Sequence, residues 1–425
     1  MQFIDFFAGI GGFRKGMELA GHKCVGFCEF DKFATASYIS MHLLTQKQRE
    51  SLEKVPLKKR QKEILKEEYR NGEWYANDIR RVYARDIPRA DCWCFGFPCQ
   101  DISVAGKQIG FQGNRSSLFF RVMYLIGQLE EENKPTYLFI ENVKNLLNVN
   151  GGWDFARLLA EMDRDGYDAE WQVLNSKDFG VPQNRERCFI IGHLRGRSTA
   201  KVFPVEGTDG ENSVQIVGHK DGYRRNTQVF APEALDTGQG GERGHHVTLP
   251  CFIDLCYEGS QMTEQARCLK ARYYKGMANH AGQDSGIAIP VLTPDRAEKR
   301  QNGRRFKDDG EPMFTLTGQD RHGIAIEVKE ATAKTLDTSC NQGIFVQVSD
   351  ELIVYAVWYE KLQCYIAIRK LTPKECFRLQ GWADDYFEKA AFVNSDSQLY
   401  KQAGNGVTVN VIFDIAKKLK EGVKD

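Results

Sequence analysis

Asp91-Cys-Trp-Cys-Phe-Gly-Phe-Pro-Cys-Gln-Asp101 is the stretch from which the rest of the sequence can be ordered. Its apolar run, residues 92–97, predicts a short buried strand, and Pro98 cannot continue a sheet ladder, so we expect the strand to stop there. Cys99 then follows the carboxyl end of the strand, at the edge where open α/β sheets bind their ligands. A thiol at that place is a candidate nucleophile, and a buried structural cysteine is the alternative.

The composition excludes several classes of protein. The chain has 425 residues, 42% of them hydrophobic, and a net charge of +1, so a nucleic-acid partner must be met by local basic patches. No apolar run reaches the roughly 18 residues of a membrane span, and a strand-like run begins at Phe3, which leaves no room for a signal peptide. The 12 cysteines include no Cys-x-x-Cys pair, which argues against a metal site and a disulfide framework and predicts a cytoplasmic protein.

A strand, a glycine turn and a helix open the chain, over residues 3–7, 8–12 and 13–20. This order is typical of a cofactor site, because glycines let a ligand approach the backbone and a helix amino terminus favours a negative group. A simple tight turn is the alternative. The next strand, residues 23–28, leads to Glu29, which is placed to bind ribose hydroxyls. The alternative role is structural, because a negative side chain just before a helix stabilises the amino terminus of that helix. Glu29 could have both roles.

Strands and helices alternate over residues 1–195, which predicts an α/β fold. Gly9, Glu29, Cys99 and Glu141 each follow the carboxyl end of an expected strand, so we expect them at one edge of the sheet. The further strands are expected over residues 74–76, 137–140, 170–174 and 187–193, and the further helices over 31–39, 116–131 and 153–162.

Two polar segments interrupt this alternation. Residues 45–72 predict a solvated helical pair, in which Lys58-Lys59-Arg60 could touch phosphate, although a solvated face is the simpler interpretation. Residues 100–115, polar and with three glycines, predict a lid beside Cys99 more than a disordered connection.

The composition changes near residue 195, and helical periodicity fades until about residue 365. A loose internal repeat predicts β-hairpin-like units. In each unit a first strand is followed by a polar loop and a return strand, and the units are 234–237 with 246–247, 267–270 with 286–287, 314–317 with 323–324, and 334–338 with 343–344. A β-rich accessory domain with solvated loops is the alternative. The expected loop tips carry side chains that hydrogen-bond base edges and phosphates, namely Gln239, Arg243, Arg272 and Arg321 among others.

Helical patterning returns at Thr372, where Thr372-Pro373 predicts a capped helix start. Gly404-Asn-Gly406 predicts a second glycine turn, ahead of a final helix over residues 407–420. The chain end would thereby return to the first domain.

Taken in order, these motifs closely resemble the bacterial cytosine-C5 DNA methyltransferases, over residues 1–195 and 369–425. The charged insertion at 45–72 and Trp382, where a different aromatic is often expected, depart from the family pattern. The matching motifs are Phe7-Ala-Gly-Ile-Gly11, Glu29-Phe30, Asp78-Ile79, Gly96-Phe-Pro-Cys-Gln100, Glu141-Asn-Val143, Gln183-Asn-Arg-Glu-Arg187, residues 369–381 and Gly404-Asn-Gly-Val407.

The resemblance implies a Rossmann-like, S-adenosylmethionine-dependent methyltransferase sheet with a second, smaller, mostly β target-recognition domain. The catalytic and cofactor-binding domain would span residues 1–195, completed by 366–425, and the recognition domain residues 196–365. The cofactor would meet Phe7, Gly9, Gly11, Glu29, Phe30, Asp78, Ile79 and Asn405. The catalytic residues would be Cys99, Glu141 and Arg185, and the DNA contacts Gln100, Ser103, Lys107, Arg115 and Arg187, with the recognition tips named above.

The chemistry accounts for these residue types. Cytosine C5 is a poor nucleophile, and addition of the Cys99 thiolate to C6 makes it an enamine carbon. Glu141, protonated or sharing a proton with ring N3, would relieve the charge that develops, and Arg185 would hold the base oxygen. The target base must leave the duplex first. We expect a monomer that acts on a specific sequence of double-stranded DNA, with any cognate restriction endonuclease acting separately.

Three other interpretations stay open at the level of sequence. The same chemistry could act on RNA, and a small-molecule methyltransferase could share the first domain, but neither needs the long segment from 196 to 365. A catalytically silent, cofactor-binding DNA regulator is the third, and the joint presence of Cys99, Glu141 and Arg185 speaks against it.

Overall fold

The computed structural model describes the two ends of the chain almost fully and its middle in short pieces. The described residues are 1–97, 118–207, 215–220, 223–228, 252–255, 261–263, 265–269, 271, 284–288, 290–292, 322–324, 343–349, 352–359, 364–366 and 368–422. They fall into two units. Unit 1 comprises Met1–Val181, Arg185–Asp209 and Phe377–Asp425, and unit 2 comprises Pro182–Asn184 and Gly210–Cys376.

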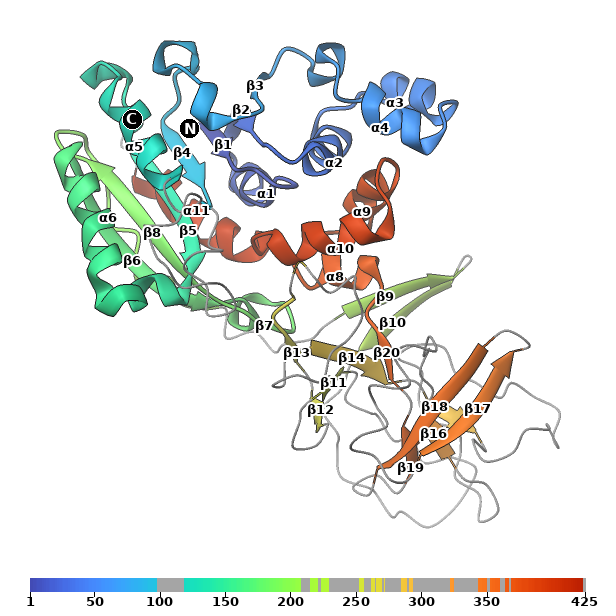
Figure 1. Cartoon of the computed structure of the whole chain (residues 1–425). Coiled ribbons are helices and arrows are strands. Elements are labelled where there is room, and N and C mark those ends of the chain that lie inside the picture. Colours follow the sequence, from blue (N-terminus) through green and yellow to red (C-terminus); the bar gives the residue numbers. More distant parts are fainter. Residues whose placement is uncertain are drawn as a thin grey trace. The chain divides into compact units, whose positions relative to one another are not determined.

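A seven-stranded sheet in the order β3-β2-β1-β4-β5-β8-β6 forms the centre of unit 1 (Figure 1). The first five strands of this order run parallel, and β8 runs antiparallel to both β5 and β6. Parallel neighbours require crossover connections, which here are mostly helical. The α/β class predicted from the sequence is confirmed. The strands are β1 (Gln2–Phe6), β2 (Lys23–Cys28), β3 (Trp74–Ala76), β4 (Cys92–Phe95), β5 (Tyr137–Val143), β6 (Tyr167–Asn175) and β8 (Glu186–Leu194).

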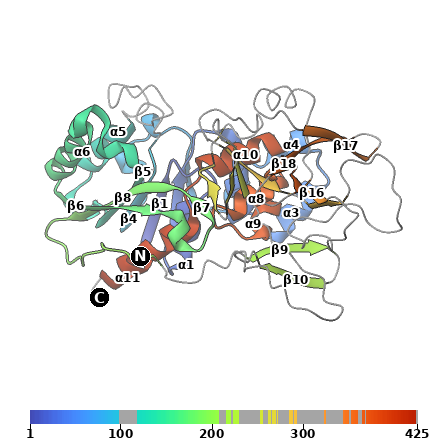
Figure 2. The ribbon, with the colours of Figure 1, turned by 90° about the horizontal axis from the view of Figure 1, so that it is seen from below.

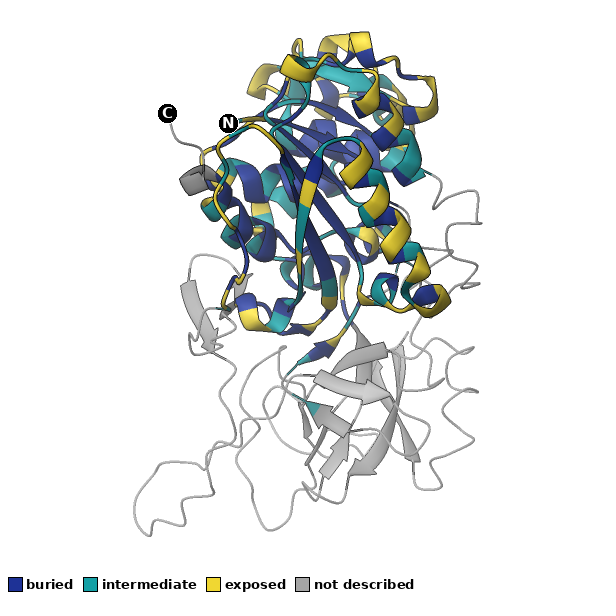
Figure 3. Cartoon of the chain, turned by 90° about the vertical axis from the view of Figure 1, so that its left-hand side faces the viewer, coloured by how far each residue is buried: buried dark blue, intermediate teal, exposed yellow. Residues whose placement is uncertain are grey.

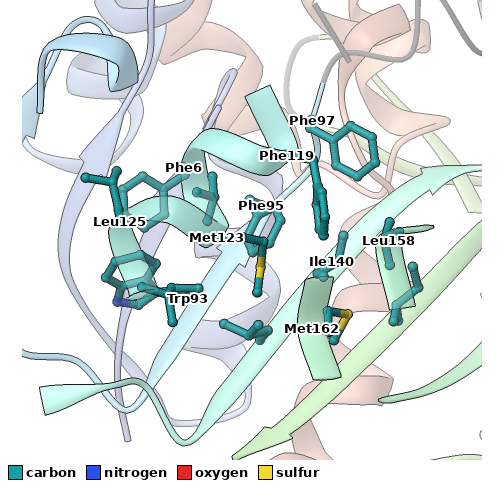
Figure 4. Packing of buried hydrophobic residues seen from close by; sticks show 14 of the residues in the cluster. Phe6, Trp93, Phe95, Phe97, Phe119, Met123, Leu125, Ile140, Leu158 and Met162 are labelled. Carbon is teal, nitrogen blue, oxygen red and sulfur yellow. The ribbon is translucent and has the colours of Figure 1, made fainter. Parts of the chain in front are cut away.

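Successive side chains of β4 alternate between two buried faces of the sheet, which explains its unbroken apolar run. Trp93 and Phe95 pack with residues of α5 (Leu118–Gly127) and α6 (Trp153–Arg164), as Figure 4 shows. Cys92 and Cys94 face the opposite side, which α1 (Gly12–Leu19) and α11 (Val409–Gly422) cover. In Figure 3 the buried strands lie between helices whose outer faces are exposed.

The chain end returns to unit 1 because α11 packs closely on α1 (Figure 2). A Cβ added at Gly12 would lie 2.6 Å from Val407 Cγ2, and one at Gly16 would lie 2.6 Å from Ile412 Cβ. The two glycines therefore allow the close approach. Residues 202–205 pack into the same core. The sequence had assigned them to the other domain, since they follow the change of composition at 195.

The charged insertion is a helical pair, as predicted, but it is anchored to unit 1. Helix α2 (Lys32–His42) precedes it, and it contains α3 (Gln46–Glu53), which starts with a capping box, and α4 (Leu57–Glu63). Leu52 and Ile64 are buried in one cluster with Val393. Most of its other side chains are exposed, as expected of a solvated pair, and these two apolar residues anchor it to the core.

Three helices precede α11 in the C-terminal segment: α8 (Pro373–Arg378), α9 (Asp384–Ala391) and α10 (Asp396–Asn405). The capped start of α8 is confirmed, since the Glu375 backbone N–H donates to Thr372 Oγ1 at 3.3 Å. The expected glycine turn over residues 404–406 is wrong. Gly404 and Asn405 complete the last turn of α10, and only Gly406 leaves the helix, with an extended backbone.

Unit 2 consists mainly of strands where it is described, in sheets ordered β12-β11-β14-β20, β15-β16-β19-β18-β17, β10-β9 and β13-β7. The expected pairing of residues 267–270 with 286–287 is wrong. Strand β13 (Ala266–Arg267) pairs with β7 (Gln183–Asn184), while Gly286 and Ile287 pair with β11 and β20. Residues 334–338 lie outside the described part, and 343–344 pair with β18.

The remaining strands of unit 2 are β9 (Gln215–Lys220), β10 (Tyr223–Gln228), β11 (Phe252–Leu255), β12 (Gln261–Thr263), β14 (Asp284–Ala288), β15 (Pro290–Leu292), β16 (His322–Ile324), β17 (Gly343–Ser349), β18 (Leu352–Tyr359), β19 (Cys364–Ile366) and β20 (Ile368–Lys370). No helix in the described parts of the chain combines the length and apolar character that crossing a membrane requires.

Candidate active site

The carboxyl ends of three neighbouring strands meet at the glycine loop. The Ala8 N–H donates to the Cys28 carbonyl at the end of β2, and the Glu29 N–H donates to the Ala76 carbonyl at the end of β3, each at 3.1 Å. Because these strands are parallel, the loop after β1 and the acid after β2 lie side by side, as the sequence predicted for Gly9 and Glu29.

The loop itself uses left-handed backbone at Phe7, Gly9 and Gly11, with φ of 54°, 56° and 83°. A Cβ at Gly11 would lie 2.5 Å from His42 Nε2, so Gly11 is required by packing. A Cβ at Gly9 would meet nothing within 4 Å. The backbone at Gly9 therefore borders open space, in which a ligand can lie against it.

Glu29 is fixed by hydrogen bonds to both carboxylate oxygens. The Gly9 N–H donates to Oε2 at 2.8 Å, and the Asp31 N–H donates to Oε1 at 2.6 Å. Desolvation raises the pKa of Glu29 in spite of these bonds. Each oxygen keeps further acceptor capacity, so the carboxylate can also accept hydroxyl groups of a ligand.

The exposed Phe30 ring is an unusual feature of this edge. Its relative exposure is 68%, and the Arg80 guanidinium lies 5.7 Å from the ring centroid. Asp78 accepts hydrogen bonds from the Arg80 side chain, which lower the pKa of Asp78. Ile79 is buried in the core, so only its backbone is left for a ligand. Asn405 is exposed at the end of α10.

These residues fit S-adenosylmethionine. A fixed carboxylate, an exposed aromatic face and free space beside a backbone glycine suit a ligand that carries sugar hydroxyls and a flat ring, as this cofactor does. The fit rests on the free space at Gly9, the exposed aromatic face and the fixed carboxylate.

Glu141 lies within β5, two residues before the strand ends at Val143. The sequence had predicted that Glu141 follows the end of the strand. Its carboxylate reaches over the end of β4, because a Cβ at Gly96 would be 3.1 Å from Glu141 Oε2. The absence of a side chain at Gly96 therefore leaves room for this carboxylate. Glu141 belongs to β5, which is two strands away in the sheet from β1, the strand that leads into the glycine loop.

Arg187 is the arginine beside Glu141. Its Nε lies 3.1 Å from Glu141 Oε1, and both side chains are largely buried. The register explains the contact, since Arg187 pairs with Val143, two residues from Glu141 and on the same face of the sheet. From the sequence, Arg187 was predicted to contact DNA, and Arg185 was predicted to bind the oxygen of the target base. The antiparallel register that decides between them is not visible in sequence.

Arg185 has a different environment. It is 3% exposed, and one of its terminal nitrogens donates to the Gly406 carbonyl at 2.7 Å, while both lie 3.4 Å from the Gly404 carbonyl. Its guanidinium thus binds the end of α10 and joins the C-terminal segment to β8.

Asn142 is a further polar residue near the end of β5, which its sequence pattern did not mark as a site residue. Its Nδ2 donates to the Phe97 carbonyl at 3.1 Å, and its Oδ1 accepts the Val143 N–H at 2.9 Å. The amide therefore holds the chain two residues before Cys99. Cys99 itself and the predicted DNA contacts Gln100, Ser103, Lys107, Arg115, Gln239, Arg243, Arg272 and Arg321 lie outside the described residues.

The family model for C-5 cytosine-specific DNA methylase matches residues 1–65 and 44–421. The chain belongs to this family. The methylase is 28% identical to the orphan methyltransferase M.SPRI of Bacillus phage SPR, over 99% of this chain and 97% of the relative. It is 28% identical to the type II methyltransferase M.HhaI of Haemophilus parahaemolyticus, over 98% and 93%. The protein is thus a DNA cytosine-5-methyltransferase.

Solved structures agree with the methylase fold. The Dnmt2 methyltransferase of S. pombe superposes with a TM-score of 0.52 at 15% identity, over 99% of this chain and 98% of that one. The Entamoeba histolytica methyltransferase EhMeth gives 0.51 at 15% identity, over 100% and 99%. At this identity the likeness concerns the fold alone.

Several cysteines of the methylase's sheet are unsuited to nucleophilic attack. Burial raises the pKa of Cys24 and of Cys188 to about 12, and raises the pKa of Cys94 well above its ordinary value. These thiols therefore stay protonated near neutral pH. Within the described residues, no cluster of three or more His, Cys, Asp or Glu side chains could hold a metal ion.

Proposed function

We propose that this methylase transfers a methyl group from S-adenosylmethionine to C5 of a flipped-out cytosine in a specific double-stranded DNA sequence, through a covalent bond between Cys99 and C6. One observation carries the proposal. The Glu141 and Arg187 pair lies over the end of β4, and Asn142 binds the Phe97 carbonyl two residues before Cys99.

Cys99 begins the reaction in this account. Its thiolate adds to C6 of the base, and the electrons of the C5–C6 double bond move to C5 and toward N3. When bound, S-adenosylmethionine supplies the electrophilic methyl group that C5 takes. Loss of the C5 proton then restores the double bond and expels the Cys99 sulfur, so that the enzyme is regenerated.

Glu141 and Arg187 orient the base during this addition. The Glu141 carboxyl can hold the N3 edge of the ring, where negative charge develops. Arg187 lies beside this carboxyl, with its Nε 3.1 Å from Glu141 Oε1 and its Nη1 donating to the Glu186 carbonyl, and we assign its guanidinium to the base oxygen. We therefore assign Arg187 the role that the sequence suggested for Arg185. Arg185 supports the site through the Gly404 and Gly406 carbonyls.

The cofactor would lie along the open side of Gly9, with its ribose on Glu29 and its adenine against Phe30, near Asp78 and the Ile79 backbone. Phe7, Gly11 and Asn405 would complete the site. Gly11 acts by shaping the loop, because the space on its side is filled by His42 and Tyr38.

A target base inside a duplex cannot reach Cys99, so the base must be flipped out, at a cost of a few kcal/mol. The segment predicted to be a lid, residues 100–115, lies outside the described residues. We assign the reading of sequence to unit 2, with Gln239, Arg243, Arg272 and Arg321 as candidate contacts. The methylase would act as a monomer. A cognate restriction endonuclease, where one exists, would act separately.

The proposal is tested by incubating the purified protein with duplex DNA and S-adenosylmethionine labelled on its methyl group. Label is expected in the DNA, and bisulfite sequencing should place it at cytosines within one short sequence. Structured RNA, added as a competitor, should take up no label. Transfer to RNA alone, or no transfer to DNA of any sequence, would contradict the proposal.

A further inference from the structure

Arg60 of the insertion binds the turn between α9 and α10. One terminal nitrogen donates to the Phe392 carbonyl at 2.7 Å, and the guanidinium lies 3.9 Å from the centroid of the Phe392 ring. Its Nε and second terminal nitrogen donate to the carbonyls of Leu52 and Glu53 at the end of α3. The Arg60 guanidinium therefore makes structural hydrogen bonds inside the protein. The sequence had placed it in a cluster that could touch phosphate, while its neighbours Lys58 and Lys59 are exposed.

Gln61 binds the same turn one residue further along. Its Nε2 donates to Asn394 Oδ1 at 2.7 Å and to the Val393 carbonyl at 3.2 Å. Asn394 in turn donates to the Phe33 carbonyl and to Ser37 Oγ of α2, each at 2.8 Å. The turn is thus held between the insertion and α2.

Helix α10 begins directly after this turn and ends at the cofactor edge. Lys401 Nζ lies 2.5 Å from Asp31 Oδ2, and Asp31 donates its backbone N–H to Glu29 Oε1. Gln402 donates to the Phe33 carbonyl at 3.0 Å. The acid assigned to the ribose is therefore tied, through Asp31, to the helix that the insertion holds.

Packing supports the same connection. Leu52 and Ile64 of the insertion, Val393 of the turn and Ala8 of the glycine loop belong to one buried cluster, with exposures of 1%, 0%, 0% and 7%. A close-packed core transmits strain between the side chains of one buried cluster. Loosening the insertion should therefore loosen the start of α10.

We propose that the insertion is a clasp for the α9–α10 turn, and that Arg60 and Gln61 are positioning residues for cofactor binding, acting through α10 and Lys401 on the Glu29 loop. This rests on the proposed use of S-adenosylmethionine. If the cofactor binds only when α10 is docked, its apparent affinity falls with the docked fraction. The insertion would then set cofactor affinity without touching the cofactor.

The test uses the full-length protein, titrated with S-adenosylmethionine by calorimetry, together with hydrogen exchange read by mass spectrometry over residues 389–402. Gln61→Leu and Arg60→Met should each weaken binding about three- to tenfold and speed exchange over these residues. Lys62→Met, an exposed neighbour on α4, is the matched control and should change neither. Gln61→Leu is the cleaner variant, because Arg60 also holds the end of α3.

Lys401→Met should weaken binding by itself, and its effect should not add to that of Gln61→Leu, since both act through one helix. Additive effects would contradict the proposal. So would faster exchange with unchanged affinity, because the clasp would then be structural only. A wild-type protein that fails to bind S-adenosylmethionine would overturn the proposed function itself, whereas normal binding by wild type and all variants would overturn the clasp alone.

Discussion

At the scale of single residues, two arginines two positions apart have separate roles. Sequence reasoning could find both in the Gln-x-Arg-x-Arg pattern but could not rank them, because the choice depends on the register of β8 against β5. Arg187 faces Glu141, and Arg185 is buried on the carbonyls of Gly404 and Gly406. Gly9 and Glu29 could be placed at one edge of the sheet from sequence, because each follows the end of a parallel strand.

This separation can be measured with a matched pair of variants. Arg187→Met should lower methyl transfer by roughly 100- to 1,000-fold, because a donor aimed at developing charge is lost, and should lower the free energy of unfolding less than Arg185→Met does. Arg185→Met should cost about 2–4 kcal/mol of unfolding free energy, because buried carbonyls lose their donor. Turnover assays and urea unfolding of both variants would check this. Equal loss of activity at equal stability would contradict the assignment.

The two glycines of the loop give a second matched pair. Gly9→Ala adds a methyl group to open space, so it should cost only the roughly 1–2 kcal/mol of left-handed strain but weaken S-adenosylmethionine binding clearly. Gly11→Ala places its methyl group against His42 and Tyr38 and should cost more stability than Gly9→Ala. Calorimetric titration and unfolding curves test both. Unimpaired cofactor binding by Gly9→Ala would mean that the cofactor does not lie there.

At the scale of elements, central strands of unit 1 such as β4 and β5 were predictable because their apolar runs are buried on both faces. The failures have specific causes. The glycine turn expected at 404–406 is a helix end, because α10 is held by tertiary contacts such as that of Gln402 with Ser37. The hairpin expected at 267–287 fails because strand pairing in unit 2 joins residues that are distant in sequence.

His42, at the end of helix α2, should make the stability of the protein depend on pH. His42 donates from Nε2 to the Ile10 carbonyl at 2.9 Å, and desolvation lowers the pKa of His42 well below its ordinary value of 6.5. Below pH 6.5 the unfolded chain therefore binds a proton that the folded chain does not. The free energy of unfolding should fall as the pH drops through this value, by up to about 1.4 kcal/mol per unit.

Urea unfolding between pH 5 and 7.5 would measure this contribution against a His42→Gln variant, whose amide keeps a donor for Ile10. The variant should show a shallower fall in stability below pH 6.5. If both proteins lose stability equally, His42 takes up its proton in the folded state as readily as in the unfolded chain, which would contradict the prediction.

At the scale of the whole molecule, the sequence suggested a first domain interrupted by a β-rich second one, and the division of labour between them stays a prediction. If unit 2 reads the DNA sequence, replacing residues 210–371 by the corresponding segment of a relative with different specificity should move methylation to that relative's sequence. Bisulfite sequencing would show the change. Specificity that stays with unit 1 would contradict the assignment.

The covalent bond between Cys99 and the base is the claim that decides the whole account. Duplex DNA with 5-fluorocytosine at the methylated position tests it, because fluorine at C5 cannot leave as a proton does, so the adduct should persist. In the presence of S-adenosylmethionine, wild-type protein should give a protein–DNA band that survives denaturing electrophoresis, and Cys99→Ser should give none while still binding the cofactor. A persistent band from Cys99→Ser, or normal methyl transfer by that variant, would contradict the account.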